Sequence, residues 1–458
     1  MQSSIAVMLA AAGVAVAQVA TTSEPALTQI QAAAATTLPY SPTSNVQGVA
    51  FNHFYQIWLE NVDYDSAFGD PNQQYLASQG IELTNYWAIT HSSEPNYACA
   101  AGGDDFGMDN DNFWQIPANV STVVDLLDTK GISWAEYQEH LPYPGFQGFN
   151  YSNQQTYAND YVRKHDPLIL YNSITSNATK LRQIKNFTSL YSDIAQNTLP
   201  QWAFITPNMT NDGHDTNVTF ASVWERGFIE NLRNNSDFWD NALILLTFDE
   251  TEHYPIGNKV FSILLGGAIP KELIGTKDDT FYTHFSSIAT VSANWGLPSL
   301  GRWDCGANIF QLVANKTGYT NFEVDTTHLL LNRSFTGPLS TNTYSTYSPI
   351  WPNPATNEKC SAGNGILQQV KDTYGNSTPT YNYTSPFPYD ARIGQDVNVA
   401  YSRNGTTYVS GVNDTSLTSS STSSSPAASS SKSAAGVAAA PGAFTLAVGG
   451  LLAMVASF

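Results

Sequence analysis

The run Ala242–Phe248 (ALILLTF) is apolar almost throughout, which restricts the fold of this chain more than any other segment. A strand covered on both faces by helices reads as a continuous apolar run, whereas a half-exposed strand alternates apolar and polar residues. Shorter runs of the same kind occur at residues 54–59, 202–205 and 260–265, and segments with helical patterns separate them. This alternation predicts an α/β fold with a largely parallel central sheet flanked by helices.

Further elements are predicted from the same patterns. Strands are expected at residues 82–89 and 132–137, and helices at residues 71–80, 119–127 and 222–233. The 42% of hydrophobic residues in 458 is ample for one large packed domain.

Polar residues follow four of the apolar runs directly. These clusters lie at residues 60–61, 90–97, 208–215 and 249–253. The carboxyl ends of parallel strands meet at one edge of a sheet, where α/β proteins bind their ligands. We therefore expect the four clusters to lie close together.

Three carboxylates in these clusters suit a metal ion. Glu60, Asp249 and Glu250 would repel one another strongly without a cation between them. Oxygen ligands favour Mg²⁺, Ca²⁺ or Mn²⁺, and the neighbouring histidines would also admit Zn²⁺. Taken alone, Asp249 and Glu250 read as a solvated strand end, and only their joint placement with Glu60 favours a site.

Ser93 is the candidate nucleophile, because it stands where a strand passes into a helix. A helix that begins there directs its N–H groups at an anion such as phosphate, and a metal would stabilise the charge that forms during attack. Asn61 and His214 could donate hydrogen bonds to phosphoryl oxygens, although residues 212–214 also read as a simple turn. Taken singly, His253 and His284 read as surface or core residues.

Several short blocks carry a family resemblance. The segment 60–69 (ENVDYDSAFG) and the segment 93–97 (SEPNY) resemble two blocks of the phosphoesterase family, which holds secreted acid phosphatases and bacterial phospholipases C. Residues 131–137, 211–215 and 248–250 look like later blocks, and so do residues 164–167 and 282–286. Blocks in the right order are more specific than any one of them. The resemblance covers about residues 51–312.

The resemblance implies an alkaline-phosphatase-like sandwich and hydrolysis through a phosphoenzyme. It makes Glu60, Asp249 and Glu250 the metal ligands, with Ser93 as a nucleophile that also touches the metal. The resemblance favours one divalent metal ion rather than the pair found in two-metal alkaline phosphatases. Ser92 remains a rival nucleophile.

The resemblance also assigns phosphate contacts. It implies this role for Asn61, His214 and His165, and His214 or His253 would protonate the leaving alcohol. The expected function is that of an acid phosphatase acting on phosphorylated small molecules, namely phosphomonoesters. Two alternatives stay open: a phospholipase C or other phosphodiesterase on the same site, and a non-enzymatic glycosylated wall protein.

The composition of the ends predicts a secreted protein on the cell surface or in the cell wall. The expected parts are a signal peptide (1–17), a leader (18–50), the catalytic domain (51–402), a Ser/Thr-rich stalk (403–436) and a GPI-anchor signal (437–458). Ser433 is the predicted attachment residue, so contact with the membrane would be through the lipid anchor alone. A single-pass transmembrane helix is the rival interpretation of the last segment.

Charge, glycosylation sequons and cysteines agree with secretion. The net charge of −19 argues against nucleic acid as a partner. Cys305 and Cys360, both in polar loop sequence, are the predicted disulfide, and Cys99 is predicted to be a buried thiol. N-x-S/T sequons, which are glycosylation acceptors, occur at Asn119, Asn150, Asn177, Asn186, Asn208, Asn217, Asn234, Asn315, Asn332, Asn376, Asn382, Asn404 and Asn413.

Overall fold

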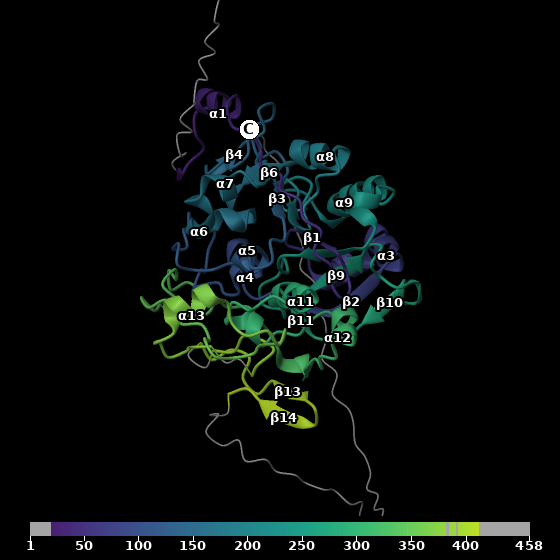
Figure 1. Cartoon of the computed structure of the whole chain (residues 1–458), viewed down its shortest axis with the longest axis vertical. Coiled ribbons are helices and arrows are strands. Elements are labelled where there is room, and N and C mark those ends of the chain that lie inside the picture. Colours follow the sequence, from purple (N-terminus) through teal and green to yellow (C-terminus); the bar gives the residue numbers. More distant parts are fainter. Residues whose placement is uncertain (1–19, 346, 382–383, 391–392, 412–458) are drawn as a thin grey trace, which may run out of the picture. The chain divides into compact units, whose positions relative to one another are not determined.

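A computed structural model of the chain describes residues 20–345, 347–381, 384–390 and 393–411. Within these residues the largest sheet has nine strands in the order β10-β2-β9-β8-β1-β7-β3-β6, with β11 beside β2 (Figure 1). The strands of this sheet are β1 (His53–Leu59), β2 (Ile81–Trp87), β3 (Trp134–Gln138), β6 (Ile184–Asn186), β7 (Trp202–Thr206), β8 (Ala242–Phe248), β9 (Lys259–Leu265), β10 (Thr276–Asp278) and β11 (Tyr282–Thr283).

The sheet is parallel except at β9. β1 pairs with β8 along its whole length, from His53 beside Ala242 to Leu59 beside Phe248, and it pairs with β7 on its other edge. β9 runs antiparallel to both β8 and β2. Because β9 is antiparallel to both of its neighbours, β2 points in the same direction as β8 and β1. The prediction of an α/β fold with a largely parallel central sheet is confirmed.

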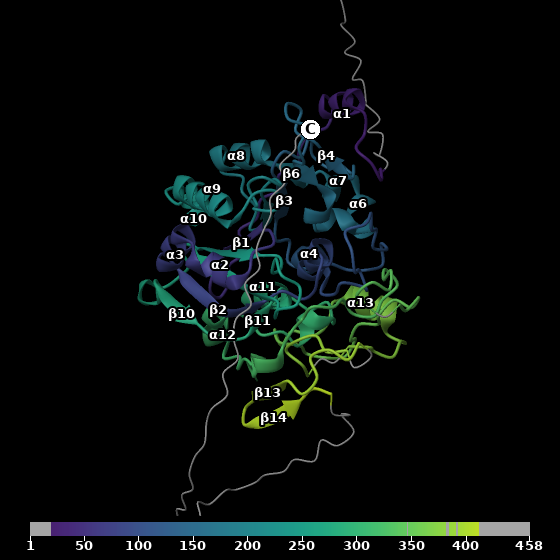
Figure 2. The same ribbon diagram turned by 180° about the vertical axis from the view of Figure 1, so that it is seen from behind.

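Helices cover both faces of the sheet, and Figures 1 and 2 show the two helical layers on either side of the strands. One layer holds α2 (Tyr64–Gly69), α3 (Pro71–Ser78), α8 (Phe187–Ala195), α9 (Val218–Leu232) and α10 (Ser236–Trp239). The other holds α4 (Ser93–Gly102), α5 (Val123–Asp128), α11 (Phe285–Trp295) and α12 (Gln311–Thr317). Every residue of α4 and α11 is buried, so these two helices form the middle of their layer.

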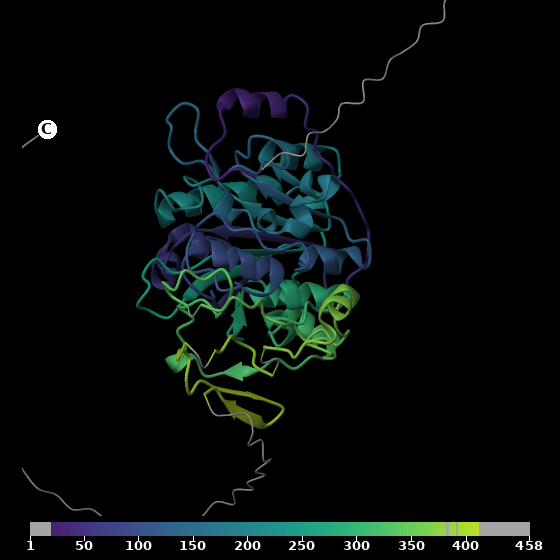
Figure 3. The same ribbon diagram turned by 90° about the vertical axis from the view of Figure 1, so that its left-hand side faces the viewer.

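Smaller elements complete the described part of the chain. The helices are α1 (Leu27–Ala34), α6 (Asn172–Thr175), α7 (Ala178–Leu181) and α13 (Gln368–Tyr374), and the strands are β4 (Asn150–Tyr151), β5 (Tyr161–Val162), β12 (Glu323–Val324), β13 (Ala400–Arg403) and β14 (Thr406–Val409). β12, β13 and β14 form a separate small sheet. α1 and the β13–β14 hairpin lie at opposite ends of the described fold (Figure 3).

Element boundaries differ most from the predictions at the starts of two helices. The helix expected at residues 119–127 begins only at Val123, because Thr122 caps it in a reciprocal arrangement with Asp125. The helix expected at residues 222–233 begins earlier, at Val218, where the side chain of Asn217 accepts a hydrogen bond from the backbone N–H of Phe220. In both cases a capping side chain sets the start of the helix.

The ends of the expected catalytic domain also have described structure. Ser44 Oγ donates to Gln201 Oε1 at 2.6 Å, which joins the expected leader to the residue just before β7. β14 lies within the segment expected to begin the stalk. The signal peptide (1–17), Ser433 and the anchor signal (437–458) lie outside the described residues. None of the helices in the described part is both long and apolar enough to cross a membrane.

The cysteines and most sequons can be placed. Cys305 and Cys360 form a disulfide, as predicted, and Cys99 is a buried free thiol in α4. Exposed sequon residues are Asn119, Asn177, Asn217, Asn234, Asn315, Asn376 and Asn404, whereas Asn150, Asn186 and Asn332 are half-buried. Asn208 is buried and its Nδ2 donates to Asp160 Oδ1 at 2.8 Å, so a glycan there would have to replace this hydrogen bond. Asn382 and Asn413 lie outside the described residues.

Candidate active site

Four strand ends meet at one edge of the sheet. Glu60 follows β1, Asp249 follows β8, Asp212 lies in the loop after β7, and Ser93 begins α4 after β2. The backbone N–H of Glu60 donates to the carbonyl of Asp212 at 2.9 Å, which fixes these two segments together. The predicted convergence of the polar clusters is therefore present in the structure.

Ser93 is buried and points at Glu60. Its Oγ donates to Glu60 Oε2 at 3.0 Å, from the first residue of α4. Ser92 points elsewhere, because its Oγ donates to Asp111 Oδ1 at 2.6 Å. Of the two serines, Ser93 is thus the one whose hydroxyl is directed at Glu60.

Asn96 holds the turn that presents Ser93. Its Oδ1 accepts from the backbone N–H groups of Ile89 and Thr90 at 2.9 and 3.2 Å. Its Nδ2 donates to the carbonyls of Thr90 and Ser92 at 2.8 and 3.1 Å. The side chain therefore satisfies four backbone groups that the strand-to-helix turn would otherwise leave unpaired.

Glu60 lies at the centre of the site with both oxygens occupied. The hydroxyl of Tyr97 donates to Oε1 in a short hydrogen bond, and His165 Nε2 lies 3.1 Å from Oε2. Burial alone would raise the pKa of Glu60, but the imidazolium of His165 outweighs it and lowers this pKa to about 2. Glu60 is therefore ionised at any pH well above 2.

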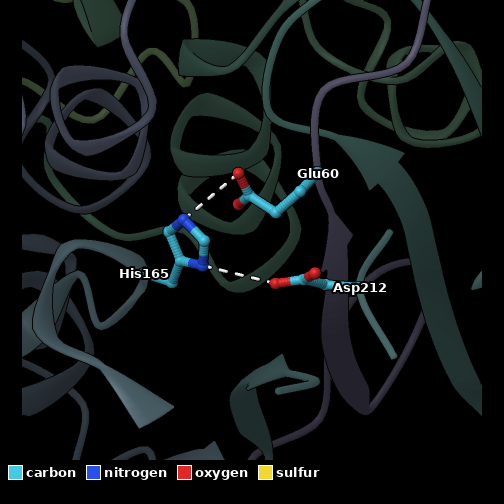
Figure 4. Close-up of side chains that lie close together, drawn as sticks. All are labelled: Glu60, His165 and Asp212. Atoms are coloured by element: carbon cyan, nitrogen blue, oxygen red, sulfur yellow. Dashed lines mark ion pairs between the residues drawn. The ribbon is translucent and has the colours of Figure 1, made fainter. Parts of the chain in front are cut away.

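His165 stands between two acids, as Figure 4 shows. Its Nε2 faces Glu60, and its Nδ1 lies 3.4 Å from Asp212 Oδ2. Burial would lower the pKa of His165, yet the charge of Glu60 raises it to about 9. Burial raises the pKa of Asp212 to about 7, against the opposing effect of His165. The imidazolium thus supplies a positive charge in the place where a metal ion would be favourable.

Asp249 and Glu250 are buried acids that Asn61 joins. The backbone N–H of Asn61 donates to Asp249 Oδ1 at 3.0 Å. The side-chain amide of Asn61, oriented with its nitrogen toward the acids, donates to Asp249 Oδ1 and Glu250 Oε1 at 3.2 Å each. Burial raises the pKa of Asp249 and of Glu250 far above the usual range, and repulsion between the acids adds to it.

Two further histidines flank these acids. His284 Nε2 lies 2.7 Å from the backbone carbonyl of Asp249, and burial lowers the pKa of His284 to about 3. A neutral His284 therefore carries its proton on Nε2 and donates to this carbonyl. His91 Nδ1 lies 2.6 Å from Glu250 Oε2, and the His91 ring stacks on Tyr254. Both histidines fix the loop after β8.

The donor set fits a divalent cation. Glu60, His165 and Asp212 each offer a ligand atom, and these atoms lie within 4.8 Å of one another. The predicted set of Glu60, Ser93, Asp249 and Glu250 shares Glu60 with this group. Asp249 Oδ2 is buried and accepts no hydrogen bond from any described residue, whereas Asp212 Oδ2 and Glu250 Oε2 each face a histidine nitrogen, at 3.4 Å from His165 and 2.6 Å from His91. Buried carboxylate oxygens without donors are stable only beside a cation or a proton.

The remaining predicted residues lie at different depths. His214 lies close to the acids, since its ring centroid is 5.8 Å from that of His165. His253 lies at the rim, where its ring is exposed and its Nδ1 lies 2.6 Å from Asp63 Oδ2. The structure thus brings Asn61, His165 and His214 to the acids and places His253 beside Asp63.

Sequence reasoning assigned no role to several residues of the site. Asp212 lies in the polar cluster at residues 208–215, but the turn-like sequence around it predicts no metal ligand. Tyr97 belongs to the recognised segment after β2, and His91 precedes Ser92 in it. Asp111 carried no signal, because it lies in a loop far from any predicted strand end.

Comparison with known proteins agrees with the resemblance. The model of the phosphoesterase family matches residues 70–298. A protein of Aspergillus fumigatus named acid phosphatase is 65% identical over 89% of this chain and 91% of its own length. A protein of Aspergillus niger with the same name is 58% identical over 87% of this chain and 96% of its own length.

A solved structure of a protein in the alkaline phosphatase superfamily from Vibrio parahaemolyticus is also similar. It is 12% identical to this chain, with a TM-score of 0.36, and the match covers 58% of this chain and 73% of the Vibrio chain. Family membership itself follows from the sequence matches, because the relatives are similar along nearly their whole length. This chain belongs to the phosphoesterase family.

Proposed function

We propose that this protein is a secreted acid phosphatase of the cell surface, which hydrolyses phosphomonoesters with Ser93 as the nucleophile and one divalent metal ion. The observation that carries the proposal is the buried hydrogen bond of 3.0 Å from Ser93 to Glu60, at the N-terminus of α4 and among acids from three other strand ends. The names of the fungal relatives support the substrate class. Family membership decides against the non-enzymatic alternative.

The metal would be held by Glu60 together with Asp249 and Glu250, with Asp212 and His165 as further candidates. When bound, it supplies positive charge that polarises the phosphoryl group and stabilises the serine alkoxide. Histidine binds a metal only as the neutral imidazole, so His165 would first lose its proton. The amide of Asn61, already directed at the acids, lies where it can also meet a phosphoryl oxygen.

The chemistry of the chain proceeds in two displacements. Ser93 Oγ passes its proton to Glu60 Oε2, which already accepts its hydrogen bond, and forms a bond to phosphorus while the bond from phosphorus to the leaving alcohol breaks. The alcohol takes a proton from His214 or His253, of which His214 lies nearer to the acids. Water then attacks the phosphoserine and releases phosphate. The N–H groups at the start of α4 favour the anionic group throughout.

The nucleophile is tested by serine substitution. Ser93→Ala is expected to lower kcat on p-nitrophenyl phosphate by at least about a thousandfold, because the covalent route is lost. Ser92→Ala is the matched control, since its hydroxyl is bonded to Asp111 instead, and it is expected to keep activity within about tenfold. Near-normal activity of Ser93→Ala would exclude Ser93 from this role. Faster turnover of bis(p-nitrophenyl) phosphate by the wild type would favour a phosphodiesterase.

The metal is tested by its removal. Dialysis of the wild type against a strong chelator is expected to abolish activity, because the acids of the site would repel the phosphate dianion. Addition of single divalent ions should restore it, and metal analysis would identify the ion that copurifies. Full activity in protein shown to be free of metal would refute the metal-assisted mechanism.

The cell-surface part of the proposal rests on the composition of the ends. We expect N-terminal sequencing of secreted protein to begin near Gln18, and endoglycosidase to reduce the apparent mass. Phosphatidylinositol-specific phospholipase C should release the activity from intact cells if Ser433 carries a GPI anchor. Retention after this treatment, together with a C-terminal peptide beyond residue 437 in the mature protein, would favour the transmembrane alternative.

A further inference from the structure

Lys164 is a second cationic residue at the site, beside His165 in the sequence. Its Nζ donates to Asp111 Oδ2 at 3.1 Å and lies 3.1 Å from His214 Nε2. The side chain is 16% exposed, so it is largely enclosed but open on one side. The chemistry described above gives this ammonium group no role.

The contact with Lys164 determines the proton position on His214. An ammonium group only donates hydrogen bonds, so His214 Nε2 must accept from Lys164. His214 Nδ1 lies 2.8 Å from Asp215 Oδ1, which accepts, so the proton of the neutral ring is on Nδ1. In this arrangement Nε2 of His214 has no proton to offer to a phosphoryl oxygen. The donor available at this point is the ammonium group of Lys164.

Asp111 ties Lys164 to the two neighbours of Ser93. Its Oδ1 accepts from Ser92 Oγ at 2.6 Å and from the backbone N–H of Glu94 at 3.0 Å, while its Oδ2 accepts from Lys164. The carboxylate therefore holds the ammonium group at a fixed place beside the start of α4, where Ser93 begins the helix.

The positive charge of Lys164 lies among several acids around Ser93. Glu60, Asp249, Glu250 and Asp111 are acids around the nucleophile, and a phosphomonoester dianion is repelled by each of them that is ionised. A lysine among carboxylates keeps its proton and remains a cation. The ammonium group carries three N–H donors, so Lys164 can direct one of them at an incoming anion in place of its present partners.

We propose that Lys164 is a catalytic residue that donates a hydrogen bond to a non-bridging oxygen of the phosphoryl group and so binds the anion beside Ser93. As Lys164 turns to the phosphoryl oxygen, Nε2 of His214 is released from its hydrogen bond and can take up a proton, which it needs before it can protonate the leaving alcohol. The inference rests on the proposed phosphatase function and names the protein's own cationic contact for its substrate.

The first test compares inhibition by inorganic phosphate between variants. Lys164→Met removes the charge but keeps the length, and it is expected to raise the Ki for phosphate and the KM by about tenfold to a hundredfold, as for a lost hydrogen bond to a charged group. Lys164→Arg is expected to recover much of this loss. Lys180→Met is the matched control, because Lys180 is also paired with two acids, Asp125 and Asp128, and is 20% exposed.

Both Lys164 variants are checked for thermal unfolding and metal content, which a loss of the phosphate contact alone leaves unchanged. An unchanged Ki for phosphate in folded Lys164→Met would overturn the inference. The proposed function fails separately, if the wild type neither hydrolyses p-nitrophenyl phosphate nor is inhibited by phosphate.

The second test uses the wild type and does not depend on the folding of a variant. In a crystal structure with orthovanadate bound at Ser93, we expect Lys164 Nζ at hydrogen-bond distance, about 2.7–3.2 Å, from a vanadate oxygen. A complex in which Lys164 still contacts only Asp111 and His214 would overturn the inference.

Discussion

Glu60 and Asp249 are neighbours with opposite protonation behaviour. Both are buried, and burial raises the pKa of each. His165 lies 3.1 Å from Glu60 and reverses the effect there, whereas at Asp249 the negative charge of Glu60 outweighs the smaller, opposing effect of His165. A single imidazolium thus decides which acid of the pair is ionised before any metal binds.

Tyr97 adds to the stabilisation of ionised Glu60 and offers a test of it. Tyr97→Phe keeps the ring that stacks on His165 but removes the hydroxyl that donates to Glu60. A hydrogen bond to the ionised form lowers a carboxyl pKa, so its loss should raise the pKa of Glu60 from about 2 by about 1–2 units. The acid limb of the kcat/KM profile is expected to move to higher pH by a similar amount.

Tyr171→Phe is the control for this experiment. Tyr171 is also buried and donates to the same helix, at the carbonyl of Ala98, but it does not touch Glu60. Its pH profile should match that of the wild type. If the acid limb of Tyr97→Phe stays in place, the hydroxyl does not stabilise the ionised form of Glu60.

The sequence predicts the residues that follow strands and misses those that do not. Glu60 and Asp249 come directly after apolar strands, and Ser93 begins the helix that follows a third strand, so strand direction predicts that these positions lie together. Asp111 has no such neighbour, and Lys164 lies in a short 3₁₀ turn, Arg163–His165. Their positions depend on how long loops pack, which no local pattern encodes.

At the level of elements, the sequence predicts the main strands but not that β9 runs antiparallel to its neighbours. The apolar run at residues 260–265 was recognised as a strand, and the structure places it in β9. Its antiparallel direction follows from the short connection after β8, since a parallel neighbour would need a longer crossover. The site is unaffected, because β9 contributes no strand end to it.

The interface of α3 with α9 contains a buried acid that makes stability depend on pH. Glu225 of α9 is buried, and its Oε2 accepts from Gln73 Nε2 of α3 at 2.6 Å. Burial raises the pKa of Glu225 from 4.5 to about 8. Between these values the unfolded chain releases a proton that the folded chain retains, so this residue makes the fold less stable as the pH rises.

Glu225→Gln is expected to remove this dependence, because glutamine keeps the shape and does not ionise. The free energy of unfolding of the wild type should fall by up to several kcal/mol more than that of the variant between pH 4.5 and pH 8. Denaturant unfolding at both pH values measures this. Glu230→Gln, an exposed change on the same helix, should leave the wild-type dependence intact. Parallel pH curves for wild type and Glu225→Gln would disprove this assignment.

On the scale of the whole molecule, the patterning of the central segment and the composition of the ends support different kinds of prediction. Patterning within 51–402 predicted the sheet and the meeting of its strand ends, and both are present. The composition of the ends predicts export and anchoring, and this stays a prediction because the signal peptide and the anchor signal lie outside the described residues. The small sheet of β12, β13 and β14 was not predicted, because its strands are only two to four residues long.

The disulfide fixes a long stretch of chain after the last strands of the main sheet. Cys305 and Cys360 are 55 residues apart in sequence. Closing a loop of this length restricts the unfolded chain, so the double variant Cys305→Ser/Cys360→Ser should lower the free energy of unfolding by about 4 kcal/mol. Activity at 25 °C should stay close to that of the wild type, since neither cysteine contacts the candidate active site.

Denaturant unfolding and thiol titration together measure this effect. Denatured wild-type protein should show one reactive thiol, Cys99, before reduction and three after it, in agreement with a single disulfide. The comparison is made without reductant, so that the bond stays closed in the wild type. Equal unfolding midpoints for the wild type and the double variant would mean that the crosslink does not stabilise the fold. A loss of activity in a folded double variant would instead mean that the crosslinked loop supports the site after all.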